Sequence, residues 1–327
     1  MDKSKSLFFL LILFSIVFIS TAHALQINGY DPVRHDRFLP GTYASNPQDN
    51  SSFYLSSYDW SGVGWETNSP SRSVALVSPL HFVGANHWRI PVGNTITFKN
   101  NDGILNNYTV GGYHTLTYTT SSGTFTPDLV VGCLTDPIPD ADNITYYPVT
   151  QYDSDGAIPP GFYPDEHFHS NDWYLGKEIF VYGWSARVGT GTFEGLQGTG
   201  TVTTNLTRTF DYLYHVSDDP QYLDEPFGVG GDSGSPTFLP WEGSLALLGT
   251  HFAHSPGETL KATYDSFIPA YISDINSAIS LSGYSLNVLN VIPEPSTFLC
   301  FVCGIIMLFY IMIKGRKRAE ANRDMSL

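Results

Sequence analysis

Short segments in which apolar and polar residues alternate recur along the chain, and clusters of turn-forming residues separate them. A period of two residues is typical of β-strands that bury one face, because successive side chains point to opposite sides of a strand. The clearest of these segments are residues 95–98, 115–118, 201–203 and 245–248. The chain also contains 30 glycines and 21 prolines, which favour turns. This pattern predicts an all-β fold.

One segment, at about residues 265–280, follows a helical period instead. Its apolar residues Ile268, Tyr271, Ile272, Ile275 and Ile279 fall on one face of a helix. Asp265 or Ser266 is placed to cap the N-terminus of that helix. The sequence therefore predicts one helix after the last strand.

The N-terminus has the features of a secretory signal peptide. Lys3 and Lys5 precede an apolar run at residues 7–19, and Ala22-His23-Ala24 matches an A-x-A cleavage site. We expect a signal peptide at residues 1–24 and a mature chain that begins at Leu25. A retained membrane anchor is the alternative, although the run is short for a membrane span.

The C-terminus combines a Pro-Glu-Pro motif at residues 293–295, an apolar run at 298–313 and a basic cluster at 314–318. This arrangement resembles the bacterial PEP-CTERM sorting signal, which we place at residues 291–318 with a transmembrane span at 298–313. The resemblance implies that an exosortase-type enzyme processes the tail. It also implies a bacterial cell-envelope location, first anchored in the inner membrane and then at the surface or outside the cell. The alternative is an ordinary C-terminal anchor, whose basic cluster would likewise stay cytoplasmic.

Composition narrows the class of protein. The formal net charge of −15 argues against a nucleic-acid partner, because phosphate binding needs concentrated positive charge. Residues 25–285 are long enough for one domain with a substantial core. Of three cysteines, Cys300 and Cys303 lie in the apolar tail, so Cys133 has no disulfide partner in that domain. We expect Cys133 to pack as a small buried hydrophobic residue.

Residues 230–236 read G-G-D-S-G-S-P and carry the strongest chemical signal in the chain. Glycines on both sides of Ser233 allow a tight turn in which the amides of Gly231 and Ser233 converge on one point. A serine hydroxyl becomes a nucleophile only when a base takes its proton and an oxyanion site stabilises the product. Such a loop is often only a turn, so a base and an orienting carboxylate are also required.

Both partners occur at suitable positions. The segment F-V-G-A-N-H ends at His87 and follows an apolar strand, and Asp128 precedes the apolar segment L-V-V-G-C-L. Asp128 lies 41 residues after His87 and 105 residues before Ser233. This order and spacing resemble those of the chymotrypsin/trypsin-like serine proteases, particularly the disulfide-poor bacterial members.

The resemblance implies two six-stranded antiparallel β-barrels, at about residues 30–140 and 150–265, followed by the helix. It assigns His87, Asp128 and Ser233 as catalytic residues, and the amides of Gly231 and Ser233 as the oxyanion hole. His81 is interpreted as a structural residue. This chemistry requires no cofactor and no metal ion. We interpret the cluster around His167, His169 and Asp172 as a solvated loop rather than a metal site.

The specificity pocket departs from that of trypsin. Phe227 lies where trypsin-like enzymes place an aspartate that binds basic side chains. Residues 249–252 read G-T-H-F and resemble the G-I-H-W of bacterial glutamyl endopeptidases. The resemblance implies a pocket with Phe227, His251 and Phe252, in which His251 binds a Glu or Asp side chain before the scissile bond. The alternative is that His251 is an ordinary half-buried strand residue.

Residues 27–29, I-N-G, resemble the activated N-terminus of trypsin-like enzymes, which pairs with the aspartate before the nucleophile. That pairing would require removal of Leu25 and Gln26. The sequence thus predicts an exported serine endopeptidase that acts on polypeptides. The alternative is an inactive homologue that binds a polymer or protein at the cell surface or in the extracellular matrix.

Overall fold

The computed structural model describes residues 25–120, 123–151, 174, 176–193, 195–197, 212–216, 223–256 and 261–290. Contacts divide the chain into two compact units, Met1–Leu289 and Asn290–Leu327. The expected signal peptide, the strand at 201–203, the loop around His167 and the sorting signal with its span lie outside the described residues. No helix in the described part of the chain is long and apolar enough to cross a membrane.

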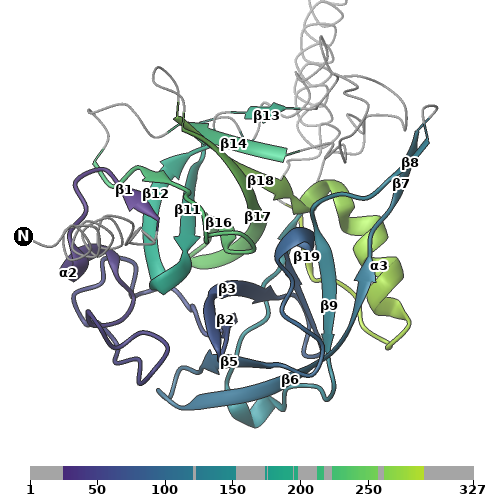
Figure 1. The fold of residues 1–327 in the computed structure, drawn as a ribbon, viewed down its shortest axis with the longest axis horizontal. Coiled ribbons are helices and arrows are strands. Elements are labelled where there is room, and N and C mark those ends of the chain that lie inside the picture. The colour runs from purple at the N-terminus through teal and green to yellow at the C-terminus, as the bar shows by residue number, and fades with distance from the viewer. Residues whose placement is uncertain are drawn as a thin grey trace, which may run out of the picture. The chain divides into compact units, whose positions relative to one another are not determined.

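Six antiparallel strands close into a barrel in the order β2-β3-β4-β9-β6-β5 (Figure 1). They are β2 (Val63–Glu66), β3 (Ser69–Leu76), β4 (His81–Gly84), β5 (Thr95–Lys99), β6 (Leu105–Thr115) and β9 (Val130–Leu134). Alternate residues of these strands, such as Val74 and Leu76 or Ile96 and Phe98, are buried together in one cluster. The strand predicted at residues 95–98 is confirmed. The segment predicted at 115–118 instead spans the end of β6 and the start of β7.

The second half of the unit is a nine-stranded sheet with the main order β12-β11-β16-β17-β18-β14-β13. Its strands are β10 (Val149–Thr150), β11 (Glu178–Gly183), β12 (Arg187–Thr192), β13 (Gly195–Gln197), β14 (Tyr212–Val216), β16 (Pro236–Trp241), β17 (Ser244–Pro256), β18 (Lys261–Phe267) and β19 (Val288–Leu289). The expected all-β class with a C-terminal helix is confirmed; of the two six-stranded barrels expected, one is closed and the other half is this nine-stranded sheet. The second sheet also contains parallel pairs, because β10 runs parallel to β17 and to β19.

An aromatic cluster joins the barrel to the second sheet. The Trp60 ring lies 5.6 Å from the Phe238 ring in an edge-to-face arrangement, and the Tyr147 ring lies 4.6 Å from the same phenylalanine. These residues belong to one buried cluster that draws on both sheets. The domain is therefore held by its core, in the absence of a disulfide in the described part. Cys133 is a free thiol and is only partly buried, which corrects the expectation that it is fully buried.

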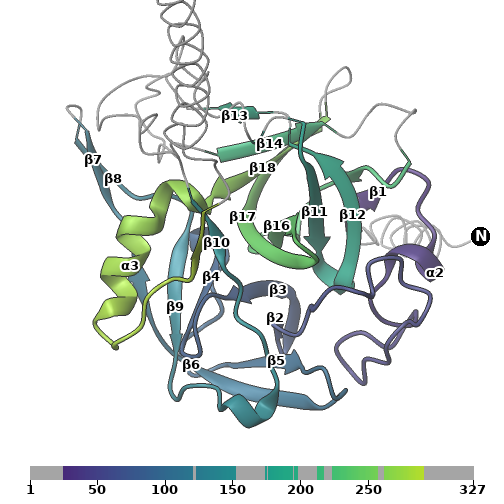
Figure 2. The same ribbon diagram turned by 180° about the vertical axis from the view of Figure 1, so that it is seen from behind.

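The C-terminal helix α3 (Ile272–Ser280) begins later than expected, after a 3₁₀ turn, η6 (Ile268–Tyr271) (Figure 2). Asp265 and Ser266 lie in β18, and no side chain caps α3. The assignment of these two residues as caps is therefore wrong, because strand pairing extends to Phe267. The other short elements are β1 (Gln26–Ile27), α2 (Pro32–His35), η1 (Asn86–Trp88), β7 (Tyr118–Thr120), β8 (Gly123–Phe125), η2 (Asp140–Asp142), η5 (Trp184–Ala186) and β15 (Pro226–Phe227).

Candidate active site

His87 lies in η1, directly after barrel strand β4. Its backbone N–H donates a hydrogen bond to Asp128 Oδ1 over 2.8 Å, and its Nδ1 lies 2.5 Å from Asp128 Oδ2. One carboxylate thus holds both the backbone and the ring of His87. This double contact fixes the orientation of the imidazole, although 47% of the side chain is exposed.

Asp128 precedes β9 and is itself supported from the second sheet. The backbone N–H of Asn86 donates to the Asp128 carbonyl over 3.4 Å, and Ser266 Oγ donates to the same carbonyl over 3.2 Å. Ser266 is buried in β18. Sequence analysis missed this role because it placed Ser266 at a helix terminus.

Ser233 completes the chain of contacts, since its Oγ lies 3.0 Å from His87 Nε2. The loop that carries it has positive φ angles at Gly231 (109°) and Gly234 (86°). A Cβ on Gly234 would lie 2.7 Å from the carbonyl oxygen of Ser73. Glycine is therefore required at position 234 both for its φ angle and for the close approach of β3.

The amides of Gly231 and Ser233 are the expected oxyanion donors. Within the described residues, neither amide donates to a backbone carbonyl, whereas the neighbouring amides of Asp232, Gly234 and Ser235 all do. The loop thus uses its other amides for its own structure.

Asp232 is buried beneath this loop. Its Oδ1 accepts from the backbone N–H of Trp184 over 2.9 Å, and its Oδ2 accepts from that of Val229 over 2.8 Å. Burial raises the pKa of Asp232 to about 6, while the charge of His251 and these amide hydrogen bonds act in the opposite direction.

The backbone of Leu25 also hydrogen-bonds to the Asp232 carboxylate. Leu25 is fully buried, whereas Ile27 pairs with Pro226 between β1 and β15. In the chain that retains Leu25 and Gln26, Leu25 rather than Ile27 is thus the residue at this aspartate, and pairing of Ile27 after removal of those two residues stays a prediction. The register of β1 brings the residue two positions earlier to the carboxylate.

The hydrogen bond to Asp128 raises the pKa of His87, burial acts against this, and the charge of Asp128 adds to the increase. A base with a raised pKa accepts a proton more readily. The arrangement can therefore take a proton from Ser233 and hold the imidazolium that results.

The expected pocket residues occupy different environments. His251 is buried, and its backbone N–H donates to the Ser235 carbonyl while its carbonyl accepts from the Gly234 N–H, each over 2.8 Å. Phe227 is buried in β15, with its ring 5.7 Å from that of His254. Phe252 is half-buried at an irregularity in the pairing of β17 with β18. Of the three residues, His251 is bonded directly to the nucleophile loop.

His251 has a partner that the sequence did not reveal. Its Nδ1 lies 3.1 Å from Asp265 Oδ1, and Thr237 donates a hydrogen bond to the other oxygen of the same carboxylate. Asp265 is fully buried. The two residues lie opposite each other on β17 and β18. Their contact could have been predicted only from the register of these two strands.

His81 is structural, as expected from the sequence. It is fully buried, its Nδ1 lies 2.8 Å from Ser78 Oγ, and its ring packs edge-to-face on Tyr284. Burial lowers the pKa of His81 to about 4, with a smaller contribution from His114. His81 is therefore held in the neutral form.

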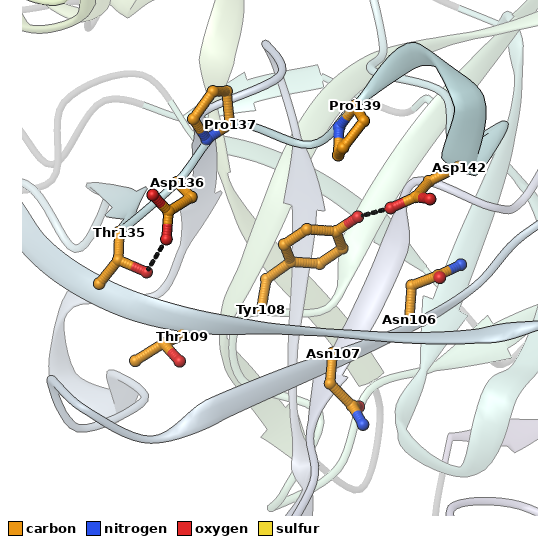
Figure 3. A pocket seen from close by; sticks show the side chains of 9 residues that line it. All are labelled: Asn106, Asn107, Tyr108, Thr109, Thr135, Asp136, Pro137, Pro139 and Asp142. Atoms are coloured by element: carbon orange, nitrogen blue, oxygen red, sulfur yellow. Dashed lines mark hydrogen bonds between the residues drawn. The ribbon is translucent and has the colours of Figure 1, made fainter.

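A separate pocket of about 370 Å³ is lined by residues of β6 and of the segment after β9 (Figure 3). Tyr108 donates a hydrogen bond to Asp142 in this pocket, and Thr135 donates to Asp136. None of His87, Asp128 and Ser233 lines it. In the described ranges, no cluster of three or more potential metal ligands occurs.

No family model and no curated protein matches the chain. Many solved structures are similar to it, including the following three. Kallikrein-related peptidase 10 is 14% identical, with 64% of this chain and 89% of that chain covered and a TM-score of 0.39. A mutant of human heparin binding protein is 11% identical, with 69% and 93% covered and a TM-score of 0.45. The complex of kallikrein-related peptidase 10 with Zn²⁺ is 16% identical, with 66% and 93% covered and a TM-score of 0.42.

Proposed function

We propose that this protein is a serine endopeptidase that hydrolyses peptide bonds through an acyl-enzyme. The observation that carries the proposal is the continuous contact from Asp128 through His87 to Ser233, at 2.5 Å and 3.0 Å. A nucleophile, a base and an orienting carboxylate within hydrogen-bond reach constitute the machinery of acyl transfer.

In the first half-reaction, His87 Nε2 takes the proton of Ser233 Oγ as the oxygen attacks the scissile carbonyl carbon. The amides of Gly231 and Ser233 donate to the oxyanion that forms. The carbon–nitrogen bond then breaks, and the imidazolium returns the proton to the leaving amine. Asp128 stabilises the imidazolium and keeps the ring oriented throughout.

In the second half-reaction, water attacks the acyl-enzyme and His87 takes a proton from it. Collapse of the second tetrahedral intermediate releases the carboxylic acid, and the proton on His87 returns to Ser233 Oγ. Atoms and protons balance over the cycle without a cofactor or a metal ion.

A fluorophosphonate probe, which reacts covalently with activated serines, tests this proposal on the full-length chain. We expect stoichiometric labelling that Ser233→Ala and His87→Ala abolish. Ser235→Ala is the matched control, because Ser235 lies in the same loop and its buried hydroxyl has no partner among the described residues. Folded wild-type protein that does not label would favour the alternative, an inactive homologue with a binding role.

We further propose that the protein is exported and held in a bacterial cell envelope until its tail is processed. The support is the sequence: the A-x-A site after the apolar run at 7–19, and the Pro-Glu-Pro motif before the run at 298–313. Replacement of residues 293–295 with alanine should retain the protein in the inner membrane. Equal release of the wild type and the variant would argue against processing at this motif.

We also propose that the enzyme prefers Glu or Asp before the scissile bond. Because Nδ1 of His251 faces Asp265, Nε2 is the ring nitrogen left for a substrate, and it donates to a substrate carboxylate only when the ring carries protons on both nitrogens. A Cβ on Gly228 would lie 2.9 Å from this Nε2, so the glycine leaves that edge of the ring uncovered by a side chain. Peptide-library cleavage tests the preference. Cuts mainly after Lys, Arg or large apolar residues, or an unchanged profile in His251→Ala, would rule it out.

A further inference from the structure

Trp88 is a large apolar side chain exposed directly beside the proposed base. It follows His87 in η1, and 38% of it is accessible to solvent. An exposed tryptophan leaves a large apolar area in contact with water, and a bound apolar group would cover it. The position is notable because His87 gives its proton to the leaving amine. A residue next to His87 therefore lies close to the part of the substrate that departs.

Arg72 holds the Trp88 ring in place. Its guanidinium carbon lies 4.6 Å from the centre of the ring, which is stacking distance for a cation–π contact. Arg72 Nη1 in turn donates to Glu66 Oε2 over 2.5 Å, and Glu66 is buried in β2. A buried carboxylate thus anchors the arginine, and the arginine supports the indole. The ring is a prearranged surface rather than a loose side chain.

The strand that carries Arg72 also packs against the nucleophile loop. Arg72 precedes Ser73 in β3, and the Ser73 carbonyl oxygen would lie 2.7 Å from a Cβ on Gly234, the residue after Ser233. The indole beside His87 is therefore supported by a side chain of the same strand that contacts the loop of Ser233.

We propose that Trp88 and Arg72 form the subsite for the residue that follows the scissile bond, with a preference for an aromatic or large apolar side chain. The inference rests on the proposed function and adds the leaving-group side of the substrate to it. An apolar class is favoured over an acidic one because Glu66 already compensates the Arg72 charge. The exposed part of the pair is then the indole surface.

Partitioning of the acyl-enzyme tests this subsite alone. The full-length enzyme is acylated with a small activated ester, and amino acid amides compete with water for the acyl group. The ratio of aminolysis to hydrolysis does not depend on how fast the acyl-enzyme forms. We expect phenylalaninamide and leucinamide to give ratios about tenfold above those of glycinamide and aspartic acid amide.

In Trp88→Ala the ratio for phenylalaninamide should fall to that for glycinamide. In Arg72→Lys, which keeps the charge but lacks the planar guanidinium, it should fall part of the way. Leu281→Ala removes a more exposed apolar side chain after α3 and should leave every ratio unchanged.

The outcomes separate the two proposals. Acylation with equal ratios for all amides, or a wild-type ratio in Trp88→Ala, overturns the subsite and leaves the proposed function intact. Failure of the ester to acylate Ser233 overturns the proposed function, and the subsite with it. A higher ratio for aspartic acid amide than for phenylalaninamide overturns the apolar preference.

Discussion

Two histidine–aspartate pairs in the described part of the chain contain a histidine that is hydrogen-bonded to the nucleophile loop, and they differ in burial. In the first, between the barrel residues His87 and Asp128, 47% and 17% of the side chains are exposed. In the second, between His251 of β17 and Asp265 of β18, only 3% and 0% are exposed. Both pairs present Nδ1 to a carboxylate, so both direct Nε2 elsewhere. In the first pair, Nε2 of His87 faces Ser233 Oγ. In the second pair, Nε2 of His251 is available to the expected specificity pocket.

The difference in burial matches a difference in task. A base must change its protonation state in every cycle, which is less costly where water and a nearby carboxylate can stabilise the charge. A residue that recognises a carboxylate must instead stay in one place, and buried hydrogen bonds to Asp265 and the nucleophile loop provide this. Under the proposed function, the same side-chain pair would supply proton transfer in one location and positioning in the other.

The largest effect is expected from breaking the exposed pair. Asp128→Asn should keep the fold but lower kcat by about 10³–10⁴-fold, as in serine proteases in general, because the ring then adopts the wrong tautomer. The pH profile of the wild type gives a second measurement. Activity requires neutral His87, so the acid limb of kcat/KM should have its midpoint above the usual histidine value of about 6.5. A midpoint at or below 6.5 would contradict the proposed role of Asp128.

Asp265→Asn breaks the buried pair and should separate recognition from chemistry. We expect kcat/KM for substrates with Glu before the scissile bond to fall about 10- to 100-fold, with a much smaller change for neutral substrates. Fluorophosphonate labelling should persist, because Asp265 contacts neither Ser233 nor His87. Thr237→Val, which removes only the other partner of Asp265, is the milder control. A uniform loss for all substrates would mean that Asp265 merely stabilises the fold.

The two pairs also differ in how far sequence could predict them. His87, Asp128 and Ser233 were located because each lies in a local motif whose glycines and apolar neighbours specify its conformation. Asp265 was missed because its role depends on a strand pairing between β17 and β18, whose register shifts between His251 and Ala253. A local helix pattern next to Asp265 suggested a cap instead. Local chemistry was therefore predictable, and chemistry created by register was not.

The N-terminal contact shows the same limit. A three-residue match suggested Ile27 as the partner of Asp232 once Leu25 and Gln26 are removed. In the chain that retains them, the antiparallel register of β1 and β15 places Ile27 opposite Pro226, and the backbone of Leu25 hydrogen-bonds to the carboxylate. The predicted strands at 95–98 and 245–248 were found because their alternation is a property of the segment itself. The position of the Leu25 backbone nitrogen instead depends on the pairing of β1 with β15, which lie nearly two hundred residues apart in the sequence.

A third histidine, His81, has a hydroxyl partner instead of a carboxylate and should respond to pH in the opposite way to His87. Its pKa is about 4 in the folded protein, below the unfolded value of about 6.5. The unfolded chain therefore binds more protons between these values, so stability should fall as pH falls from 6.5 to 4. Because His81 is fully buried, this change in its pKa should alter the free energy of unfolding by about 3 kcal/mol across the window. The difference in unfolding free energy between the wild type and His81→Gln, measured by denaturation across this window, isolates the effect. A difference that is constant with pH would contradict it.

The smallest effect concerns Asp232, the buried carboxylate of the nucleophile loop. Its folded pKa of about 6 exceeds the unfolded value of 3.8, so its contribution to stability should decrease as pH rises through this window. The predicted cleavage after Ala24 would turn the Leu25 amide into an ammonium group next to this carboxylate. The new charge should lower the pKa of Asp232 and remove most of the decrease. We therefore expect the free energy of unfolding of the chain that begins at Leu25 to fall less between pH 4 and pH 6 than that of the same chain with one alanine added before Leu25. Equal decreases would show that the Leu25 nitrogen contributes only as a hydrogen-bond donor, which both chains retain.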